Sequence, residues 1–559
     1  MPKIEIDNKP VEVPAGTNLI EAARLLNIEI PHYCYHPGLA VVGSCRMCQV
    51  ECEHNGRKSI VVGCNTMAAD GMKITTSSVA IRDIQRGVLE FYLQHHPLDC
   101  PICDDAGECD LQNYYMRYGL HESRVDLDEK RHKHKVHDVG PTVVLDSERC
   151  VLCSRCVRFC REIAGVDELG IFGQGGNAEL MNVPGKRLEN PYAGNVVDLC
   201  PVGALTDKDF RFKRRVWYLK RTPSICTGCS RGCNIYVDWE TERSYKNPQR
   251  RIQRLKPRYN RAVNEWWICD RGRYGYRTTD GADRLTAPHT KLESNGGPLA
   301  VSSVIERAAG KIKATLDKHG AKAIAVLASA HSSNEDLFLL KRLFVDYLKV
   351  QCVDVNLGKE QKGEEDGILM KSDLSPNRRG ALEMGVQPWG GSGLPGDEIV
   401  AGALDGDFEV LIVINHDLTA NLAPKQLGKL EQHCGYVLYL GTHVSAMNEL
   451  AHDVIPIAVW AEREASYTNF QGRVQRTWRP FDPLGLAVSE WEVWRDLAAR
   501  LGLELKCDSP PEVFDSIGES IASFKGLTWE GLGAGGKMLT GVSESPYRKV
   551  QSPRPLAAY

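Results

Sequence analysis

The stretch "HHPLDCPICDDAGEC", residues 95–109, places three cysteines and two histidines within fifteen positions. A complete cluster or zinc site needs four soft ligands, and only three thiols lie close together here. His96 stands four positions before the first cysteine and can supply the fourth ligand, whereas we expect His95 to point to a different helix face. The stretch therefore predicts a metal site, group two, with the ligands His96, Cys100, Cys103 and Cys109.

Two kinds of metal suit group two. Thiolates bind iron–sulfur clusters and zinc, and zinc also accepts sites of three cysteines and one histidine. We favour a [4Fe–4S] cluster and keep zinc as the alternative. A neutral imidazole in place of a thiolate removes one negative charge, which favours the reduced state and raises the potential. The histidine would therefore tune such a cluster.

Cysteine usage and composition indicate the class of protein. Seventeen of the twenty cysteines lie between Cys34 and Cys269. The first residues, "MPKIEIDNKPVEVPAG", lack the basic and apolar regions of a signal peptide, so clustered cysteines indicate metal rather than disulfides. A net charge of −3 argues against a general nucleic-acid binder. No stretch approaches the roughly 18 to 20 apolar residues of a membrane span. We expect a cytoplasmic protein.

Group one has the spacing C-x10-C-x2-C-x15-C and consists of Cys34, Cys45, Cys48 and Cys64. A long gap, C-x2-C and a second long gap are typical of plant-type ferredoxins with altered loop lengths, which indicates [2Fe–2S]. We prefer Cys64 to the nearby Cys52 because Cys64 follows the apolar stretch "IVVG", a strand end that can return to the loop.

The residues around group one have the order of a small β-grasp ferredoxin. Residues 3–13 alternate in two short runs around Asp7 and Asn8, which predicts a β-hairpin, and the stretch "NLIEAARLLNI" then has helical spacing. Residues 79–97 predict an amphipathic helix that ends at Pro97 and carries both histidines on its last turn. Its expected apolar face consists of Ile81, Ile84, Val88 and Phe91.

Group three begins with a C-x2-C-x2-C run, a specific signature of [4Fe–4S] clusters, at Cys150, Cys153 and Cys156. Its fourth ligand has two candidates. Cys160 completes a bacterial ferredoxin run, but that run sends its fourth cysteine to a second cluster and follows it with proline. Arg161 follows Cys160, whereas Pro201 follows Cys200. We therefore choose Cys200 and interpret Cys160 as a structural thiol.

Group four has the spacing C-x2-C-x3-C-x35-C and consists of Cys226, Cys229, Cys233 and Cys269. Two close pairs would favour a zinc ribbon, whereas three close cysteines and one distant cysteine favour another [4Fe–4S] cluster, with zinc as the alternative. Five cysteines remain, and each is interpreted as a packing residue: Cys52, Cys160, Cys352, Cys434 and Cys507.

The second half of the chain has a different pattern. A helical pattern at 301–318 precedes five apolar strands that alternate with helices or loops. The expected strands are 323–329, 352–356, 409–415, 435–441 and 454–460. This alternation predicts a parallel, doubly wound α/β sheet.

The order of the four groups resembles the large iron–sulfur subunit of bacterial respiratory complex I, NADH:quinone oxidoreductase. The stretches "HHPLDCPICDDAGECDLQ", "RYNRAVNEWWICDRGRYGY" and "SYTNFQGRVQ" look like that family, over about residues 1–500. The resemblance implies an electron-transfer subunit, not a substrate site, and no catalytic residue in this chain. Electrons from the NADH/FMN subunit would pass through its clusters toward quinone.

The resemblance also implies the order of transfer and the partners. The group-one cluster would receive electrons and group three would follow and hand them on, with group two between those sites or beside them. Group four would lie off the main path. Partners would be the flavin/NADH-binding subunit, its [2Fe–2S] companion and downstream iron–sulfur subunits of a membrane-associated complex. The chain would lie at the inner face of the cell membrane. It would not span the membrane itself and would not bind nucleic acid.

The α/β half resembles molybdopterin oxidoreductases such as formate dehydrogenase. Those enzymes are longer and end in a further cofactor-binding domain, so we expect a degenerate copy without molybdopterin. The expected cofactors are one [2Fe–2S] and three [4Fe–4S] clusters. The expected domains are a β-grasp ferredoxin domain (1–78), a His/Cys3 cluster domain (79–118), a ferredoxin-like cluster domain (119–218), an additional cluster domain (219–275) and the α/β domain (276–559).

Two alternatives belong to other classes. The iron–sulfur subunit of an NAD-linked formate dehydrogenase would need a cysteine or selenocysteine and a histidine beside molybdenum. The related iron-only hydrogenase would need further cysteine motifs after group three. Neither Cys352 nor Cys434 has the expected loop context. A binding protein with zinc in all four groups would be colourless, so an absorption spectrum separates it from every iron–sulfur interpretation.

Overall fold

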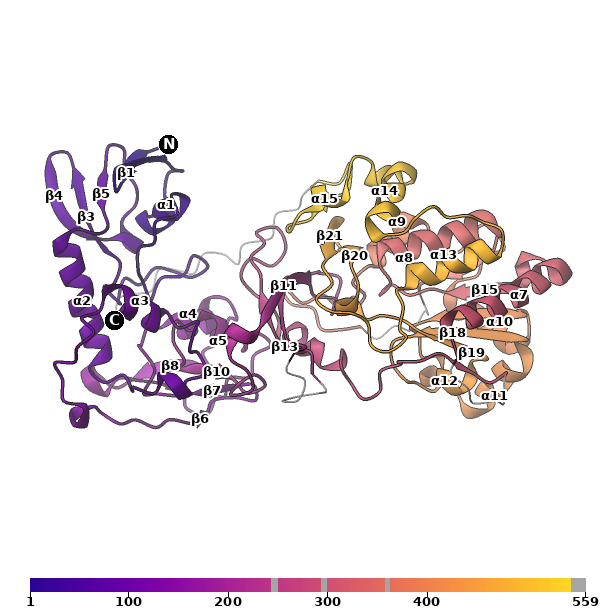
Figure 1. Ribbon diagram of the computed structural model, residues 1–559, viewed down its shortest axis with the longest axis horizontal. Helices are drawn as coiled ribbons and strands as arrows, with labels where there is room; N and C mark the ends of the chain where they lie inside the picture. The colour runs from indigo at the N-terminus through magenta and orange to yellow at the C-terminus, as the bar shows by residue number, and fades with distance from the viewer. Residues whose placement is uncertain (243–249, 293–298, 357–361, 544–559) are drawn as a thin grey trace. The chain divides into compact units, whose positions relative to one another are not determined.

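The structure is a computed structural model that describes residues 1–242, 250–292, 299–356 and 362–543 (Figure 1). The chain forms two compact units, of which the first is Met1–Leu219 and the second begins at Lys220. The fold class predicted from the sequence is confirmed: a ferredoxin-like N-terminal domain and cluster-binding domains precede an α/β domain of molybdopterin-oxidoreductase type.

Unit 1 opens with a mixed sheet in the order β2-β1-β5-β3-β4. Its strands are β1 (Lys3–Ile6), β2 (Lys9–Glu12), β3 (Gln49–His54), β4 (Arg57–Val62) and β5 (Lys73–Thr75). Helix α1 (Leu19–Leu25) packs its apolar side chains against β1 and β3 in one core. The predicted hairpin is confirmed, because β1 and β2 pair antiparallel and Asp7 and Asn8 have φ of 48° and 65°. Two central residues with positive φ make the tight turn that matches strand twist.

The helix after this sheet is shorter than predicted. Helix α2 (Val79–Leu93) ends at its C-cap, Gln94, so His95 and His96 lie in the turn after the helix rather than on its last turn. Proline disfavours helical backbone at the preceding residue, which places the helix end before His96. The predicted apolar face was also wrong in part, since Phe91 is 80% exposed. The buried positions of α2 are Ile81, Gln85 and Leu89.

The remainder of unit 1 consists of short elements around cysteines. Helix α3 (Asp110–Tyr118) packs on α2. Strands β10 (Leu205–Asp207), β7 (Val143–Leu145) and β6 (His137–Asp138) form a small antiparallel sheet in that order. The other elements are α4 (Arg155–Glu162), α5 (Asn195–Leu199) and the hairpin of β8 (Leu169–Phe172) with β9 (Glu179–Asn182).

Unit 2 begins with an antiparallel sheet that carries the group-four segment. Its order is β11 (Lys220–Ile225), β12 (Asn234–Trp239) and β13 (Ile252–Pro257). Helix α6 (Asp270–Tyr274) follows and packs on β13. The sheet therefore places the start of β12 and the start of α6 close to the loop after β11.

The main sheet of unit 2 has the order β14-β19-β18-β17-β15-β16. The five predicted strands are confirmed and all pair parallel: β15 (Ile324–Leu327), β16 (Cys352–Asp354), β17 (Val410–Ile414), β18 (Tyr436–Gly441) and β19 (Asp453–Pro456). A short edge strand, β14 (His289–Thr290), adds antiparallel to β19. The chain passes from β15 to β16 on one side and then returns to β17 on the other, which makes a topological switch point between β15 and β17.

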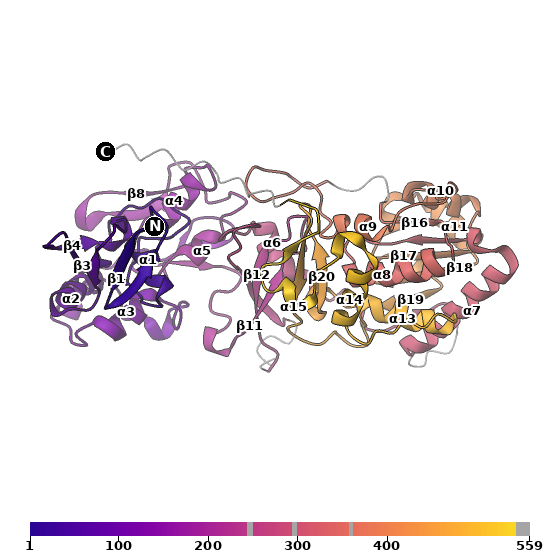
Figure 2. The same ribbon diagram turned by 90° about the horizontal axis from the view of Figure 1, so that it is seen from above.

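Helices cover both faces of this sheet, which is why its strands are apolar throughout. One hydrophobic core joins the sheet to α7 (Val301–His319), α8 (Asn334–Leu340), α13 (Glu490–Arg500) and α14 (Pro510–Ser520). The opposite core joins it to α10 (Gly396–Asp405), α11 (Pro424–His433) and α12 (Met447–Leu450). Figure 2 shows α10 and α11 on one side of the sheet and α13 on the other. The doubly wound prediction is confirmed.

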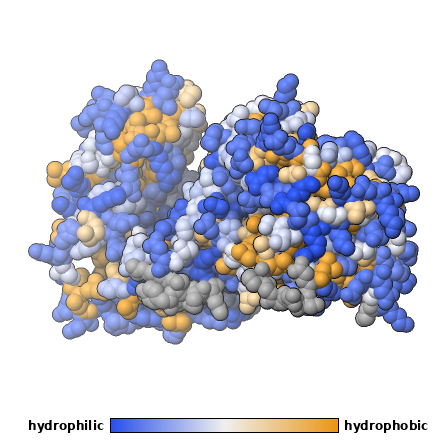
Figure 3. Space-filling model, turned by 45° about the vertical axis from the view of Figure 1, so that its right-hand side comes forward, coloured by the Kyte–Doolittle hydropathy of each residue, from blue (hydrophilic) through white to orange (hydrophobic). Residues whose placement is uncertain are grey.

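Smaller elements complete unit 2. Strands β20 (Ala465–Thr468), β21 (Arg473–Thr477) and β22 (Lys537–Met538) form an antiparallel sheet beside α9 (Arg378–Met384) and α15 (Trp529–Leu532). On the face drawn in Figure 3, hydrophobic residues form separate patches among hydrophilic ones. Within the described residues, no helix has the length and apolar character that crossing a membrane requires.

Candidate iron–sulfur sites

The structure brings the four thiols of group one together beside the start of β3 and the end of β4. All four are buried, and Cys34 contacts both Cys45 and Cys64 through hydrogen bonds, while Cys48 contacts Cys64. The hydrogen bonds from Cys45 and Cys64 lower the pKa of Cys34, and the donors have raised pKa values in turn. Four buried thiols joined by this series of contacts are a fitting donor set for a [2Fe–2S] cluster.

The end of β4 brings Cys64 to this site, as the sequence predicted for the strand end. Gly63 N–H donates to the Cys48 carbonyl at 2.8 Å, and a Cβ at Gly63 would lie 3.0 Å from that oxygen. A larger residue at position 63 would therefore separate the two ligand loops. Cys52 lies instead on β3, and burial alone raises its pKa, without a contribution from another thiol.

The thiols of group three line one cavity. The lining of this small cavity includes Cys150, Cys153, Cys156 and Cys200. Cys160 is buried on α4 and is not among the lining residues. Burial raises the pKa of Cys156, and the charges of Cys153, Cys150 and Cys200 contribute in that order, which identifies these thiols as neighbours.

The residues of group two lie around a second, apolar cavity. His96, Cys100 and Cys109 line it, whereas His95 does not. Cys103 is not among the residues that line this cavity. Burial raises the pKa of Cys109 to about 12, and Cys103 is one of the nearby charged groups that contribute, so the two thiols are neighbours. The four predicted residues therefore belong to one neighbourhood. Burial lowers the pKa of His96 to about 4, so its imidazole is neutral at pH 7 and can bind a metal through a ring nitrogen.

His95 has a different environment. Its Nδ1 atom accepts a hydrogen bond of 3.4 Å from the backbone N–H of Arg131. The backbone carbonyl of His96 accepts a 3.0 Å hydrogen bond from the Lys130 ammonium group, which fixes the turn that presents the ring. The turn after α2, rather than a helix face, therefore separates the two histidines.

A glycine that the sequence analysis missed closes group two. A Cβ at Gly203 would lie 2.4 Å from the Cys103 sulfur, so only glycine lets the loop after Cys200 cover this thiol. Asp110 N–H also donates to the Pro201 carbonyl at 2.9 Å. The residues directly after Cys109 and Cys200 are thus in contact, which joins the loops of group two and group three.

Group four lies where β11, β12 and α6 meet. The N–H of Cys226 donates to the Cys233 carbonyl at 2.8 Å, and Cys269 is the N-cap of α6. A Cβ at Gly272 would lie 2.9 Å from the Cys226 sulfur and 3.5 Å from the Cys269 sulfur. Burial raises the pKa of Cys233, with contributions from Cys226, Cys229 and Cys269. All four predicted residues are therefore neighbours.

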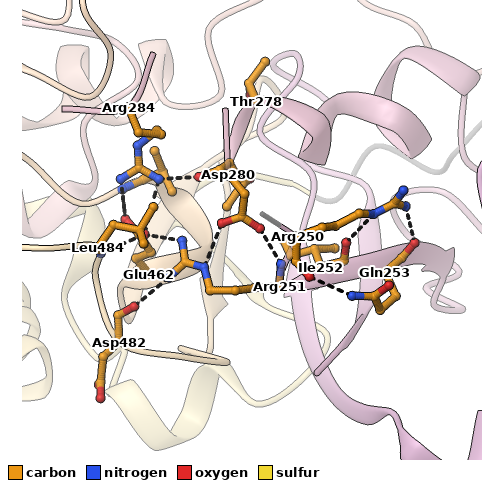
Figure 4. A network of polar contacts seen from close by, with 12 residues as sticks. Arg250, Arg251, Ile252, Gln253, Thr278, Asp280, Arg284, Glu462, Asp482 and Leu484 are labelled. Carbon is orange, nitrogen blue, oxygen red and sulfur yellow. Dashed lines mark hydrogen bonds and ion pairs between the residues drawn. The ribbon is translucent and has the colours of Figure 1, made fainter. Parts of the chain in front are cut away.

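An ion-pair network links the group-four segment to the α/β domain of unit 2 (Figure 4). Arg251 donates to Asp280 at 2.7 Å and to Glu462 at 2.6 Å, and Arg284 donates to Glu462 at 2.7 Å. Glu462 is completely buried. These contacts join the residues on either side of Cys269 to the turn before β20.

The donor chemistry of the four groups fits iron–sulfur clusters. Burial raises the pKa of Cys150 to about 12 and that of Cys269 to about 11, so these two thiols are protonated at pH 7 when no metal is bound. A bound metal deprotonates a coordinating thiol. The described residues contain no group of three or more His, Cys, Asp or Glu side chains close enough to hold a single metal ion. A [4Fe–4S] cluster is bound at separate iron atoms, so its ligands need not converge on one point.

Three of the remaining cysteines lie in the cores of unit 2. Cys352 and Cys434 belong to the core beneath α10 and α11, and Cys507 belongs to the core beneath α13 and α14. These positions agree with the packing role that the sequence indicated.

Five protein-family models match the chain in the order of its parts. A 2Fe-2S iron-sulfur cluster binding domain matches residues 2–79. The NADH-ubiquinone oxidoreductase-G iron-sulfur binding region matches 85–124, and the ferredoxin-like domain of NADH-quinone oxidoreductase subunit 3 matches 140–206. A molybdopterin oxidoreductase Fe4S4 domain matches 219–281, and molybdopterin oxidoreductase matches 390–500.

Whole-chain relatives carry related names. An NADH-quinone oxidoreductase subunit of Rickettsia felis is 28% identical over 92% of this chain and 89% of its own length. The mitochondrial NADH-ubiquinone oxidoreductase 78 kDa subunit of Neurospora crassa is 30% identical over 92% of this chain and 83% of its own. A solved chain of an NAD+-reducing [NiFe]-hydrogenase is 30% identical and covers 38% of this chain and 91% of its own, with a TM-score of 0.35.

The fold and the cysteine groups define a component of an oxidoreductase with 2Fe-2S and 4Fe-4S binding domains. An α/β domain of molybdopterin-oxidoreductase type is part of the same chain. The chain belongs to the family of large iron–sulfur subunits of NADH:quinone oxidoreductase, in agreement with the resemblance seen in its sequence.

Proposed function

We propose that this chain is the electron-transfer subunit of an NADH:quinone oxidoreductase, which relays electrons from an NADH/FMN subunit toward quinone. The observation that carries the proposal is the contact between cysteine groups in unit 1, where the loops of group two and group three touch directly. Clusters bound at these groups supply one-electron carriers. The chain supplies ligands, burial and fixed spacing, and no residue of it acts on a substrate.

We further propose one [2Fe–2S] cluster at group one and one [4Fe–4S] cluster at each other group. The cavity lining supports Cys200 as the fourth ligand of group three, because Cys200 faces the cavity and Cys160 does not. The cavity lining and the neutral ring support His96 in group two. The common contact of Cys226 and Cys269 with Gly272 supports the distant cysteine of group four.

The α/β half is proposed as a scaffold without molybdopterin. In doubly wound sheets a cofactor binds in the crevice at the switch point, beyond the carboxyl ends of the strands. Here His416, which follows β17, donates from Nε2 to the carbonyl of Ala328, which follows β15, at 2.7 Å. This hydrogen bond spans the two strand ends of the switch point. It supports a domain in which this crevice holds no molybdopterin.

The proposed partners are the flavin/NADH-binding subunit, its [2Fe–2S] companion and the downstream iron–sulfur subunits. In this proposal the chain lies at the inner face of the cell membrane through those subunits. The proposed domains follow the expected boundaries, with the α/β domain from residue 276 as the last. The Rickettsia felis and Neurospora crassa relatives are both oxidoreductase subunits, which supports a multi-subunit setting.

The experiment compares Cys34→Ser with Cys52→Ser in the purified complex. NADH should reduce quinone in the wild type and in Cys52→Ser, because Cys52 lies on β3 and has no other thiol among the groups that shift its pKa. Cys34→Ser should lose the [2Fe–2S] signal and quinone reduction but retain NADH oxidation by ferricyanide, which takes electrons at the flavin. Full quinone reduction in Cys34→Ser would contradict the relay.

A further inference from the structure

Helix α4 presents one polar face to the loop of group one. Arg155, Arg158 and Glu162 have the spacing of residues on one helix face, and all three are buried, whereas Arg161 is exposed. The helix begins directly after Cys153 and Ser154 and contains Cys156. A single helix therefore carries a group-three ligand and a set of buried charges.

The guanidinium group of Arg158 contacts backbone at both cysteine groups. Its Nη2 atom donates to the carbonyl of Cys34, a group-one residue, and to the carbonyl of Cys153, a group-three residue, at 3.4 Å. Its Nη1 atom donates to the Ala40 carbonyl, and its Nε atom donates to the Ser154 hydroxyl at 3.2 Å. The planar fork of arginine thus binds the two ligand loops at once, which a lysine point charge does less well.

The neighbouring side chains of α4 hold the same loop. Arg155 donates to the Tyr35 carbonyl at 2.7 Å and to the carbonyl of Leu199, the residue before Cys200, at 3.2 Å. Glu162 accepts a hydrogen bond of 2.8 Å from the N–H of Ala40. Three side chains of one helix therefore fix the loop from Cys34 to Ala40 against group three.

A buried cation between two clusters has an electrostatic consequence. Arginine is not deprotonated in proteins, and Arg158 is only 5% exposed, so its charge acts through the low dielectric of the interior. Each cluster becomes more negative on reduction. A nearby positive charge stabilises the reduced form and raises the midpoint potential, as net charge does for clusters generally.

We propose that Arg158 is a positioning residue that sets the spacing of the group-one and group-three clusters and raises the potential of both. The inference rests on the proposed function, because it requires clusters at these two groups. Electron transfer slows steeply with distance, so one side chain bound to both ligand loops would keep the pair at a fixed separation. No ligand role or reaction with substrate is assigned to it.

The test is a redox titration, followed by low-temperature EPR, of the purified complex with Arg158→Gln, Arg158→Lys and the control Arg161→Gln. Glutamine removes the charge, so the reduction equilibrium constant of each cluster should fall about tenfold. This corresponds to a decrease of about 59 mV in each midpoint potential for a one-electron reduction. Lysine keeps the charge, so the reduction equilibrium constant of each cluster should stay within threefold of wild type. Electron transfer from group one to group three should become slower, because lysine cannot bind both loops. Arg161→Gln should match wild type, since Arg161 is exposed and pairs with Asp167 at 2.9 Å.

Unchanged potentials in Arg158→Gln, with both clusters present, would overturn the inference. If Arg158→Gln fails to assemble its clusters, the test is made with Arg158→Lys. Assembled clusters whose two midpoint potentials equal those of wild type support the role of the charge. Two lowered midpoint potentials, or clusters that fail to assemble, overturn it. Absence of either cluster from the wild-type complex would instead contradict the proposed function. A purely structural side chain would change cluster content without shifting the potentials of the clusters that remain.

Discussion

Glu462→Gln should destabilise unit 2 more than most single substitutions. Glu462 is completely buried, and its carboxylate accepts hydrogen bonds from Arg284 at 2.7 Å and from Arg251 at 2.6 Å. Glutamine has nearly the same shape but no charge, so two guanidinium groups lose their common anion. Removal of one partner from a buried ion pair costs about 3–5 kcal/mol of unfolding free energy. For a unit of this size, with about 2.1 cal/mol/K of unfolding entropy per residue, that corresponds to a fall in Tm of about 4–7 °C.

The assay is thermal and urea unfolding followed by tryptophan fluorescence. Asp482→Asn is the control, because Asp482 joins the same network through its backbone carbonyl and its side chain is 88% exposed. Exposed substitutions of this kind change stability by about 0.5 kcal/mol or less. If the unfolding free energy of Glu462→Gln is as close to wild type as that of the control, the guanidinium groups of Arg251 and Arg284 do not need the Glu462 charge, and the prediction is wrong.

The same residue predicts a pH dependence. Burial by itself would raise the pKa of Glu462, but the hydrogen bonds and charges of Arg284 and Arg251 hold it below its ordinary value. A lowered folded-state pKa gives stability that is fully present above the unfolded value of about 4.3 and is lost as the pH falls through the folded value. The stability difference between wild type and Glu462→Gln should therefore be constant near pH 7 and shrink below about pH 4.

The remaining predictions concern ligands and metal content. His96→Ala should remove one [4Fe–4S] EPR signal and quinone reduction while His95→Ala spares both; the reverse result would exclude His96. His96→Cys should rebuild a cluster of lower potential because a thiolate restores negative charge, and an unchanged or higher potential would refute that charge argument. Cys200→Ser should lose the group-three signal and Cys160→Ser should keep it. The opposite pair of results would show that Cys160, not Cys200, is the fourth ligand. Elemental analysis of the complex should find molybdenum near zero, and stoichiometric molybdenum would identify an active α/β domain.

Local patterns predicted the elements whose structure depends on local chemistry. Asp7 and Asn8 adopt positive φ more readily than most residues, so they marked the turn of the first hairpin. The apolar runs of the main sheet predicted parallel strands because both faces of that sheet are buried. Cysteine spacing likewise predicted which thiols lie together, since short runs such as 150–156 leave little freedom for their backbone.

Contacts between distant segments were not predictable in this way. The role of Gly203 depends on Cys103, which lies one hundred positions earlier and approaches it only after folding. Arg158 resembles an ordinary charged helix residue until the loop at Cys34 is packed against it. The helical spacing of Arg155, Arg158 and Glu162 was visible in the sequence, but this spacing does not indicate which segment packs against them. The end of α2 at Leu93 was also missed, although Pro97 marked its region.

The iron–sulfur assignment is tested most simply by the cluster content of the anaerobically purified protein, measured by Mössbauer spectroscopy and EPR with iron, sulfide and zinc analysis. We expect the spectra of one [2Fe–2S] and three [4Fe–4S] clusters, with iron and sulfide in the matching amounts and zinc near zero. The [2Fe–2S] component should disappear in Cys64→Ser and persist in Cys52→Ser. A colourless protein that contains stoichiometric zinc, or a [2Fe–2S] signal that survives Cys64→Ser, would contradict the assignment.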